Sequence, residues 1–238
     1  MGIDNPGPLN ACPTKQARRV LGHRANRATE APPMTFFRTH LAECPVIAVL
    51  RGLTPVAADE AAKRLWHIGV ELVEITVQDA AGFDTLKAVA LTAASIGRLI
   101  GAGSVTSVEA FERTVSCGAS FVVSPGLDVE LIDHANDRRV PYLPGVATPS
   151  EIQLARSRGV LDQKLFPSRE LGGTAFVKAM TGPFPDVQLV PSGGVSIADI
   201  DSYLAAGALG VGIGSEITES VGAQVMGDWL ALREAAPS

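Results

Sequence analysis

A regular alternation of short apolar runs and longer helical patterns begins at Pro45 and continues almost to the end of the chain. Parallel strands that are covered on both faces appear in a sequence as nearly continuous apolar runs of roughly four to eight residues. We therefore predict an α/β fold on a parallel sheet, with strands at residues 46–50, 71–77, 98–102, 120–124, 141–143, 161–166, 187–191 and 210–213.

Helical patterns separate these strands and carry the residues that favour helix starts. Thr54 and Thr148 each precede a proline, as N-cap residues often do, and Ser196 stands ahead of Asp199. The predicted helices are residues 55–66, 83–95, 107–117, 129–138, 149–158, 174–180, 197–206 and 221–233. Eight β–α units within residues 41–238 predict a single (β/α)8 TIM barrel, with a doubly wound open sheet as the alternative.

Residues 1–40 differ from the rest of the chain. They hold five of the 16 prolines and six basic residues against two acidic ones, and no periodic apolar stripe. Such a composition predicts a disordered extension. A targeting leader is the alternative, but the segment lacks serine and the apolar run that secretory leaders contain.

The overall composition excludes several classes of protein. The longest apolar runs have strand length, far below the roughly 20 residues that a membrane-spanning helix requires. A net charge of −5 gives no reason to expect a nucleic-acid partner. The three cysteines share no close spacing, so neither a disulfide framework nor a zinc knuckle is indicated. We therefore expect a cytoplasmic protein without a membrane or nucleic-acid partner.

Among the charged residues of the predicted strands, Lys164 and Glu74 are the candidates for chemistry. Lys164 is the only one of the five lysines in such a position. Burying an ammonium group costs roughly several kcal/mol, and burial therefore favours the neutral amine. A neutral amine can form a Schiff base with a carbonyl compound. Glu74 shares a strand face with Leu72 and Thr76, and we expect it to point into the mouth of the barrel. A salt bridge between Lys164 and Glu74 is the alternative.

Other candidates follow the strands. Arg51 ends the first strand, at the edge where barrel active sites assemble, and can bind a carboxylate or phosphate or form a rim salt bridge. Glycine clusters at residues 192–195 and 212–215 follow the last two strands. Their backbone N–H groups are typical of barrel phosphate sites, with tight turns as the alternative.

Metal-dependent and serine-based chemistry is not indicated. The four histidines lie in or near the N-terminal segment or on helices, without HxH or HExxH spacing. No GxSxG elbow, Walker loop or GxGxxG motif at the start of a βαβ unit is present. We therefore expect no metal and no other cofactor.

Eight short motifs resemble, in order, those of the KDPG/KDPGal aldolases, class I lyases that act on 2-keto-3-deoxy-6-phosphosugar acids of the gluconate or galactonate type. The resemblance covers about residues 41–235. Each motif alone is weak, but eight in register along the chain are specific. They lie at residues 48–52, 73–76, 101–105, 124–126, 144–148, 164–167, 192–195 and 214–215.

The resemblance implies a role for each candidate. Lys164 is the Schiff-base lysine, and Glu74 is the proton shuttle. Ser104 stands where the family usually has a threonine that binds the pyruvate carboxylate, and Arg51 contacts substrate. The products are pyruvate and glyceraldehyde 3-phosphate, and the family is usually a metal-independent homotrimer. The phosphate-binding positions are Gly193, Gly194, Gly214 and Ser215.

One position departs from the gluconate-type enzymes. They commonly carry an arginine four residues after the catalytic glutamate, where this chain has Gln78. Galactonate-type enzymes tend to have an amide-like residue there, and the stretch 50–55 also resembles theirs. The sugar configuration stays open. Two other classes also stay open, an isomerase or epimerase that uses Glu74 as a base and a non-catalytic barrel that binds a phosphorylated ligand.

Overall fold

The computed structural model describes residues 36–235 and arranges their strands in two parallel sheets. The first has the order β5-β4-β3-β2-β1-β9, and the second has the order β6-β7-β8. Neighbours in each sheet are consecutive in the chain, apart from β1 and β9, so the order never reverses. The strands are β1 Val46–Leu50, β2 Leu72–Thr76, β3 Gly101–Gly103, β4 Phe121–Val123, β5 Tyr142–Leu143, β6 Gly145–Val146, β7 Asp162–Leu165, β8 Gln188–Pro191 and β9 Val211–Ile213.

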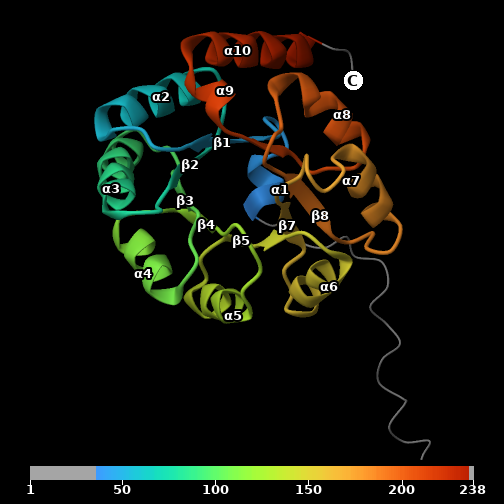
Figure 1. Cartoon of the computed structure of the whole chain (residues 1–238). Helices are drawn as coiled ribbons and strands as arrows, with labels where there is room; N and C mark the ends of the chain where they lie inside the picture. The colour runs from blue at the N-terminus through green and yellow to red at the C-terminus, as the bar shows by residue number, and fades with distance from the viewer. Residues whose placement is uncertain (1–35, 236–238) are drawn as a thin grey trace, which may run out of the picture. The chain divides into compact units, whose positions relative to one another are not determined.

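The sheets curl around a common centre, and helices form a ring outside them (Figure 1). The predicted α/β alternation is therefore confirmed, and the open sheet with a reversed strand order is wrong. A parallel bridge between Ser192 and Gly212 joins neighbouring edges of the two sheets. The helices are α1 Phe36–His40, α2 Pro55–His67, α3 Ala80–Ser95, α4 Val108–Ser116, α5 Val129–Arg138, α6 Pro149–Ser157, α7 Thr174–Thr181, the 3₁₀ turn η1 Ile197–Asp199, α8 Ile200–Ala205, α9 Ser215–Thr218 and α10 Ser220–Ala235.

The predicted strand at residues 141–143 is observed as β5, and a second short strand, β6, which was not predicted, follows it after a proline. Pro144 lies between β5 and β6 and has no N–H group to donate to a neighbouring strand. β5 pairs with β4, whereas β6 pairs with β7. The third strand also begins later than predicted, at Gly101, and runs to Gly103.

Side-chain caps start the helices close to the strands that precede them. Thr54 accepts a hydrogen bond from the backbone N–H of Ala57 at 3.3 Å, and Thr148 forms a capping box with Glu151. Each cap satisfies an N–H group that has no partner within its helix. The connections from β1 to α2 and from β6 to α6 are therefore short, and the carboxyl ends of the strands gather at one face.

Strand residues divide into an outer and an inner set. On β2, Val73 and Ile75 belong to the apolar layer between strands and helices, as predicted. Leu72 packs inside the ring instead. The inner apolar cluster comprises Phe37, Leu41, Ile47, Leu72, Phe121, Val123, Leu143 and Val190. Because side chains alternate along a strand, Glu74 is on the same face as Leu72.

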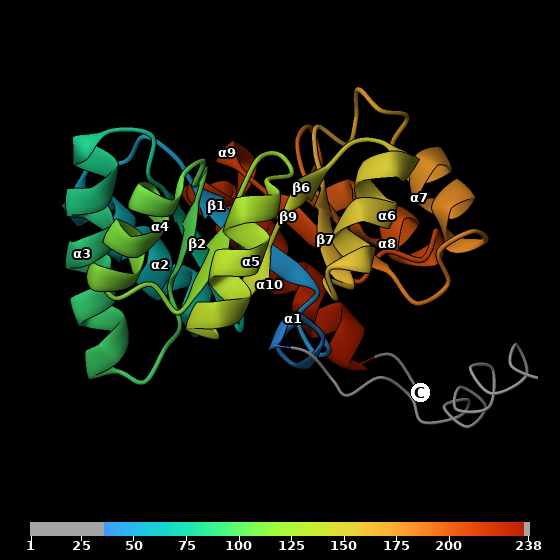
Figure 2. The ribbon, with the colours of Figure 1, turned by 90° about the horizontal axis from the view of Figure 1, so that it is seen from below.

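Residues 36–40 differ from the expectation of a disordered extension from 1 to 40. They form helix α1, which lies beneath the strands in Figure 2. Phe37 is buried and stands edge-on to Phe121, with ring centroids 5.8 Å apart. A five-residue helix is too short to show a periodic pattern in the sequence, and its apolar side chains cover an otherwise open end of the core. Residues 1–35 lie outside the described part of the chain.

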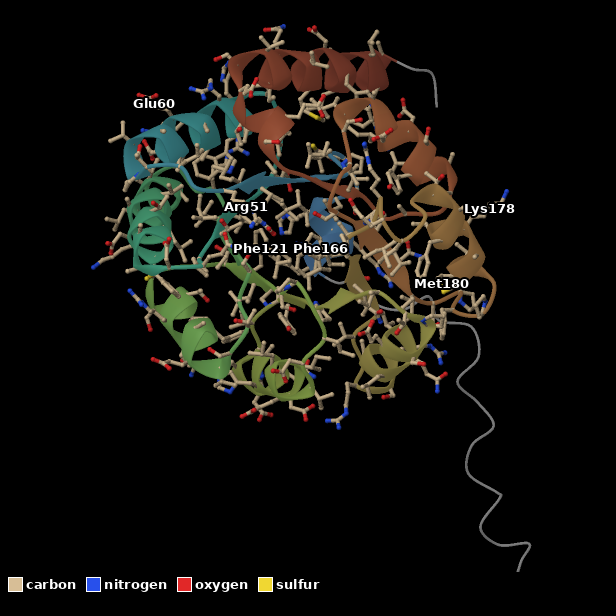
Figure 3. All side chains as sticks on the ribbon, viewed as in Figure 1. Arg51, Glu60, Phe121, Phe166, Lys178 and Met180 are labelled. Atoms are coloured by element: carbon tan, nitrogen blue, oxygen red, sulfur yellow. The ribbon has the colours of Figure 1, made fainter. Side chains whose placement is uncertain are left out.

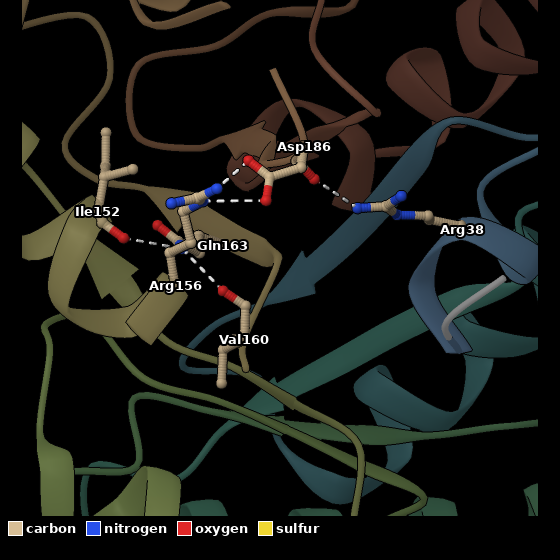
Figure 4. A network of polar contacts seen from close by, with 6 residues as sticks. All are labelled: Arg38, Ile152, Arg156, Val160, Gln163 and Asp186. Atoms are coloured by element: carbon tan, nitrogen blue, oxygen red, sulfur yellow. Dashed lines mark hydrogen bonds and ion pairs between the residues drawn. The ribbon is translucent and has the colours of Figure 1, made fainter. Parts of the chain in front are cut away.

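An ion pair and a hydrogen bond of Arg38 hold α1 to the second sheet. The Arg38 guanidinium lies 2.7 Å from Asp162 at the start of β7. It also donates to the backbone carbonyl of Asp186 at 3.1 Å (Figure 4). The Asp186 carboxylate in turn accepts two hydrogen bonds of 2.9 Å from Nε of Arg156 on α6. These contacts lie at the strand starts, away from the face where the carboxyl ends gather. Among the described residues, no helix is long and apolar enough to cross a membrane.

Candidate active site

Lys164 and Glu74 lie on the inner side of the two curled sheets, on β7 and β2. Nζ of Lys164 is 3.9 Å from Oε1 of Glu74, and both residues are buried, with 8% and 2% of their surface exposed. The fold thus brings together two residues that are 90 positions apart. A small cavity beside them is lined by Ile47, Val49, Glu74, Val123, Leu143, Lys164, Val190, Ser192 and Gly212.

Burial changes the acidity of Glu74. Removal from water raises the pKa of its carboxyl group, because the charged form loses hydration. The positive charges of Lys164 and Arg51 act in the opposite direction but are weaker. At 3.9 Å the contact with Lys164 is an ion pair without a hydrogen bond. Glu74 is therefore close enough to Lys164 to exchange protons with it through a water molecule.

Gly103 on β3 makes space for the Glu74 carboxylate. A Cβ atom at this position would lie 2.4 Å from Oε1 and 2.8 Å from the carboxyl carbon of Glu74, well inside van der Waals contact. Only glycine therefore accepts the observed position of the glutamate. The interpretation of the sequence missed this function of Gly103, although the glycine-rich stretch at 101–103 was a signal for it.

Ser104 follows β3 directly and has a backbone φ of +64°. Left-handed backbone in a residue other than glycine costs about 1–3 kcal/mol and is concentrated at functional sites. β3 is paired with β2, with Gly103 opposite Thr76. Ser104 therefore lies at the same edge of the sheet as the end of the strand that carries Glu74.

Arg51 and Gln78 meet at the ends of β1 and β2. Nη1 of Arg51 donates to Oε1 of Gln78 at 3.1 Å, and both side chains are exposed. Figure 3 shows Arg51 on the inner side of the ring of helices, whereas Glu60 and Lys178 lie on its outer side. The amide of Gln78 thus orients the guanidinium without neutralising its charge, which leaves it able to bind an anion.

The two glycine clusters lie side by side because of the bridge between Ser192 and Gly212. Gly193 and Gly194 follow β8 with φ of +89° and +73°, a region that favours glycine. A Cβ on Gly212 would lie 2.7 Å from Oγ of Ser192, so the close approach also requires glycine. Gly214 and Ser215 stand at the junction of β9 and α9. All four expected phosphate positions therefore belong to one region of the rim.

Ser192 is a further polar residue that the interpretation of the sequence did not single out. It is buried and lines the same cavity as Lys164 and Glu74. It stands two positions after Val190, which packs inside the ring, so the alternation of strand side chains was the signal that could have identified it.

The sequence of this chain is similar to those of several known proteins. Residues 37–233 match the family model described as KDPG and KHG aldolase. A 2-dehydro-3-deoxy-phosphogluconate aldolase of Pseudomonas aeruginosa is 43% identical over 137 residues, which cover 58% of this chain and 61% of that protein. The chain thus aligns with less than two thirds of that relative's length. A 2-dehydro-3-deoxy-phosphogluconate aldolase of Pseudoalteromonas atlantica is 32% identical over 192 residues, which cover 81% of this chain and 88% of that protein.

A solved structure agrees with these matches. The KDPG aldolase of Legionella pneumophila, with pyruvate captured at low pH as a covalent carbinolamine intermediate, superposes with a TM-score of 0.74. It is 29% identical in sequence, and the alignment covers 85% of this chain and 99% of that one. The similarity therefore extends over the fold as well as over the short motifs.

Proposed function

The chain belongs to the KDPG and KHG aldolase family, and on this premise we propose that it cleaves a 2-keto-3-deoxy-6-phosphosugar acid to pyruvate and glyceraldehyde 3-phosphate. The observation that carries the proposal is the buried pair of Lys164 and Glu74, 3.9 Å apart within an apolar ring of strands. A reactive amine and a proton-transferring carboxyl group at this distance are what a class I aldolase needs.

Lys164 provides the covalent step. Its neutral amine attacks the C2 ketone, and the resulting carbinolamine loses water to give an iminium ion. The iminium withdraws the electron pair of the C3–C4 bond as that bond breaks. The C4 hydroxyl proton leaves at the same time, so the aldehyde departs and an enamine of pyruvate remains. Protonation at C3 and hydrolysis of the iminium then release pyruvate and restore the amine.

Glu74 moves the protons of this sequence. As a carboxylate it accepts the C4 hydroxyl proton, and as an acid it returns a proton to C3. A group that performs both steps works best when its pKa is near the working pH. Burial raises the pKa of Glu74 in that direction, which supports this assignment.

The remaining candidates bind the substrate. Ser104 contributes its hydroxyl to the pyruvate carboxylate, and Arg51, oriented by Gln78, contacts the acid or its hydroxyl groups. The phosphate group is held at the other side of the rim, so its binding energy orients C3 and C4 next to Glu74. The proposed phosphate-binding residues are Gly193, Gly194, Gly214 and Ser215.

We also propose that the two sheets close into one eight-stranded (β/α)8 barrel. The bridge between Ser192 and Gly212 supports closure on one side, and the direct passage of the chain from β5 to β6 supports it on the other. The family resemblance further supports a cytoplasmic homotrimer that needs no metal or other cofactor. Its partners are then pyruvate and the phosphorylated keto acid, and light scattering tests the trimer.

Trapping with borohydride tests the function. The wild-type protein incubated with pyruvate and sodium borohydride is expected to gain one reduced pyruvyl group, located on Lys164 by peptide mass spectrometry. Lys164→Ala should neither be labelled nor cleave substrate, whereas Lys178→Ala, a change on the outer surface, should behave as wild type. Absence of label on a wild-type protein that still converts a phosphosugar would favour the isomerase or epimerase alternative.

The choice of substrate needs its own assay. Pyruvate release from the gluconate and galactonate substrates, coupled to lactate dehydrogenase, compares the two values of kcat/KM. Gln78 in place of an arginine predicts a preference for the galactonate substrate, because hydrogen bonds to a single hydroxyl group distinguish the two sugars. Equal values, or a preference for the gluconate substrate, would contradict this prediction.

A further inference from the structure

Arg169, in the loop between β7 and α7, covers the glycine cluster that follows β8. Its backbone N–H donates to the carbonyl of Gly193 at 3.1 Å. A Cβ on Gly194 would lie 2.7 Å from Cβ and 2.9 Å from Nε of Arg169. The arginine side chain therefore passes directly over Gly194, beside the backbone to which we assign phosphate binding.

The guanidinium group of Arg169 is held weakly. Nη2 lies 3.5 Å from Oδ2 of Asp199, and 63% of the arginine side chain is exposed. That same oxygen accepts shorter hydrogen bonds from the backbone N–H and the hydroxyl of Ser196, at 3.0 and 2.7 Å. These bonds from Ser196 are the main reason that the pKa of Asp199 is lowered. Asp199 thus keeps its position without Arg169, and the arginine N–H groups are available to a ligand.

Negative charges lie beside this part of the rim, so a bound phosphate group needs a positive charge nearby. Two carboxylates act as caps here, Asp199 on Ser196 and Glu216 on the backbone N–H of Ile197 at 3.0 Å. A phosphate monoester brings about two further negative charges at neutral pH. Within residues 166–173, 192–196 and 214–215, all of which the structure describes, Arg169 is the one basic residue.

We propose that Arg169 is a substrate-binding residue that pairs with the phosphate group and so favours phosphorylated over unphosphorylated 2-keto acids. This inference rests on the proposed function. A guanidinium group offers paired N–H donors that match two phosphate oxygens, and it carries its charge at every physiological pH. The phosphate displaces the 3.5 Å contact with Asp199, while backbone N–H groups of the glycine clusters bind its remaining oxygens.

Kinetics with two substrates test the proposal. For Arg169→Ala, KM for the phosphorylated substrate should rise about tenfold relative to KM for 4-hydroxy-2-oxoglutarate, which has no phosphate group, because a charge-assisted pair is lost. Arg169→Lys should recover part of the affinity, since it restores the charge but not the paired donors. Lys178→Ala removes the same charge from the outer surface and should change neither value.

A purely structural role for Arg169 predicts a different result. Asp199→Asn would then impair binding as Arg169→Ala does, since each change breaks the contact between the two residues. If Arg169 binds phosphate directly, Asp199→Asn removes a repulsive charge and should lower KM for the phosphorylated substrate or leave it unchanged. An equal rise in KM for both substrates, in both variants, would overturn the proposal.

Binding of inorganic phosphate separates this inference from the proposed function. Calorimetric titration of wild-type protein and Arg169→Ala with phosphate requires no catalysis, and the variant should bind about tenfold more weakly. Equal affinities would refute the role of Arg169 even if the borohydride experiment labels Lys164. Conversely, failure of pyruvate trapping with intact phosphate binding would count against the aldolase and not against Arg169.

Discussion

At the scale of single residues, the site consists of groups whose properties depend on burial. Glu74 and Lys164 are enclosed by apolar strand residues, and Gly103 leaves room for the carboxylate. Burial gives Glu74 a raised pKa, and proximity to Lys164 gives it a proton-transfer partner. Because its pKa is raised, Glu74 keeps its proton to a higher pH than an exposed glutamate does, and it can therefore both accept and donate a proton during catalysis.

The pH dependence of kcat/KM should report Glu74. The base is the carboxylate, which exists above its pKa and is lost as the pH falls through it. Because burial raises this pKa, the acidic limb should lie above about 4.3, the value for glutamate in a peptide. Glu74→Gln should lower kcat by roughly 10²- to 10⁴-fold and abolish that limb. An acidic limb at or below the peptide value in the wild type would contradict the assignment.

Gly103→Ala tests the close contact with Glu74. The added methyl group would overlap the carboxylate, so Glu74 must move, and a displacement of about 1 Å can cost roughly 100-fold in kcat. We also expect a loss of about 1–3 kcal/mol in the free energy of unfolding from overpacking. Gly182→Ala is a matched control, because a Cβ there meets no atom within 4 Å and φ is −68°. Unchanged kcat in Gly103→Ala would refute the steric argument.

At the scale of secondary-structure elements, the two ends of the strands have separate tasks. The carboxyl ends carry Glu74, Lys164 and the rim loops, whereas α1 closes the opposite end. Capped helices were predictable because N-cap residues and prolines are local signals, and Thr54 and Thr148 cap as expected. Helix α1 was not predictable, because its stability derives from the burial of Phe37, and five residues are too few to show a periodic pattern.

Phe37→Ala should therefore destabilise the fold without altering the chemistry. Loss of a buried phenyl group typically costs about 3–5 kcal/mol, which urea denaturation measures. Phe36→Ala, at a half-buried neighbouring position, should cost less. Both variants should retain wild-type kcat below their unfolding transitions, because α1 is distant from the strand ends that carry the site. A selective loss of kcat in Phe37→Ala would show that α1 takes part in catalysis.

At the scale of the whole molecule, a parallel bridge joins neighbouring edges of the two sheets. Ser192 and Gly212 form that bridge, and the cavity beside Lys164 is lined by both residues. The bridge also brings the loops after β8 and β9 together. The stability of the fold and its affinity for phosphate should therefore depend on the same residues.

Gly212→Ala is expected to affect both properties. Its Cβ would lie 2.7 Å from Oγ of Ser192, which pushes β8 and β9 apart. The free energy of unfolding should fall by about 1–3 kcal/mol, and inorganic phosphate should bind more weakly. Adding Ser192→Gly removes the clashing hydroxyl and should restore part of the stability. If the double variant is no more stable than Gly212→Ala, the contact with Ser192 is not the cause.

The sequence by itself determined the α/β class, the succession of the main strands and helices along the chain, and the presence of Lys164 and Glu74 within strands. Local periodicity and cap residues are visible within short stretches of the sequence. The scarcity of lysine is visible from a count over the whole chain. The sequence also pointed to the glycine clusters of the rim. Gly193 and Gly194 do adopt the left-handed backbone that only glycine enters easily.

Only the tertiary structure decided which residues meet. The 3.9 Å approach of Lys164 to Glu74, the fit of Gly103 to the carboxylate and the position of Arg169 over Gly194 all join distant parts of the chain. Such contacts depend on strand order, register and the direction of each side chain, which no local pattern contains. The chemical groups were therefore predictable from the sequence, whereas their distances follow from how the strands curl around a common centre.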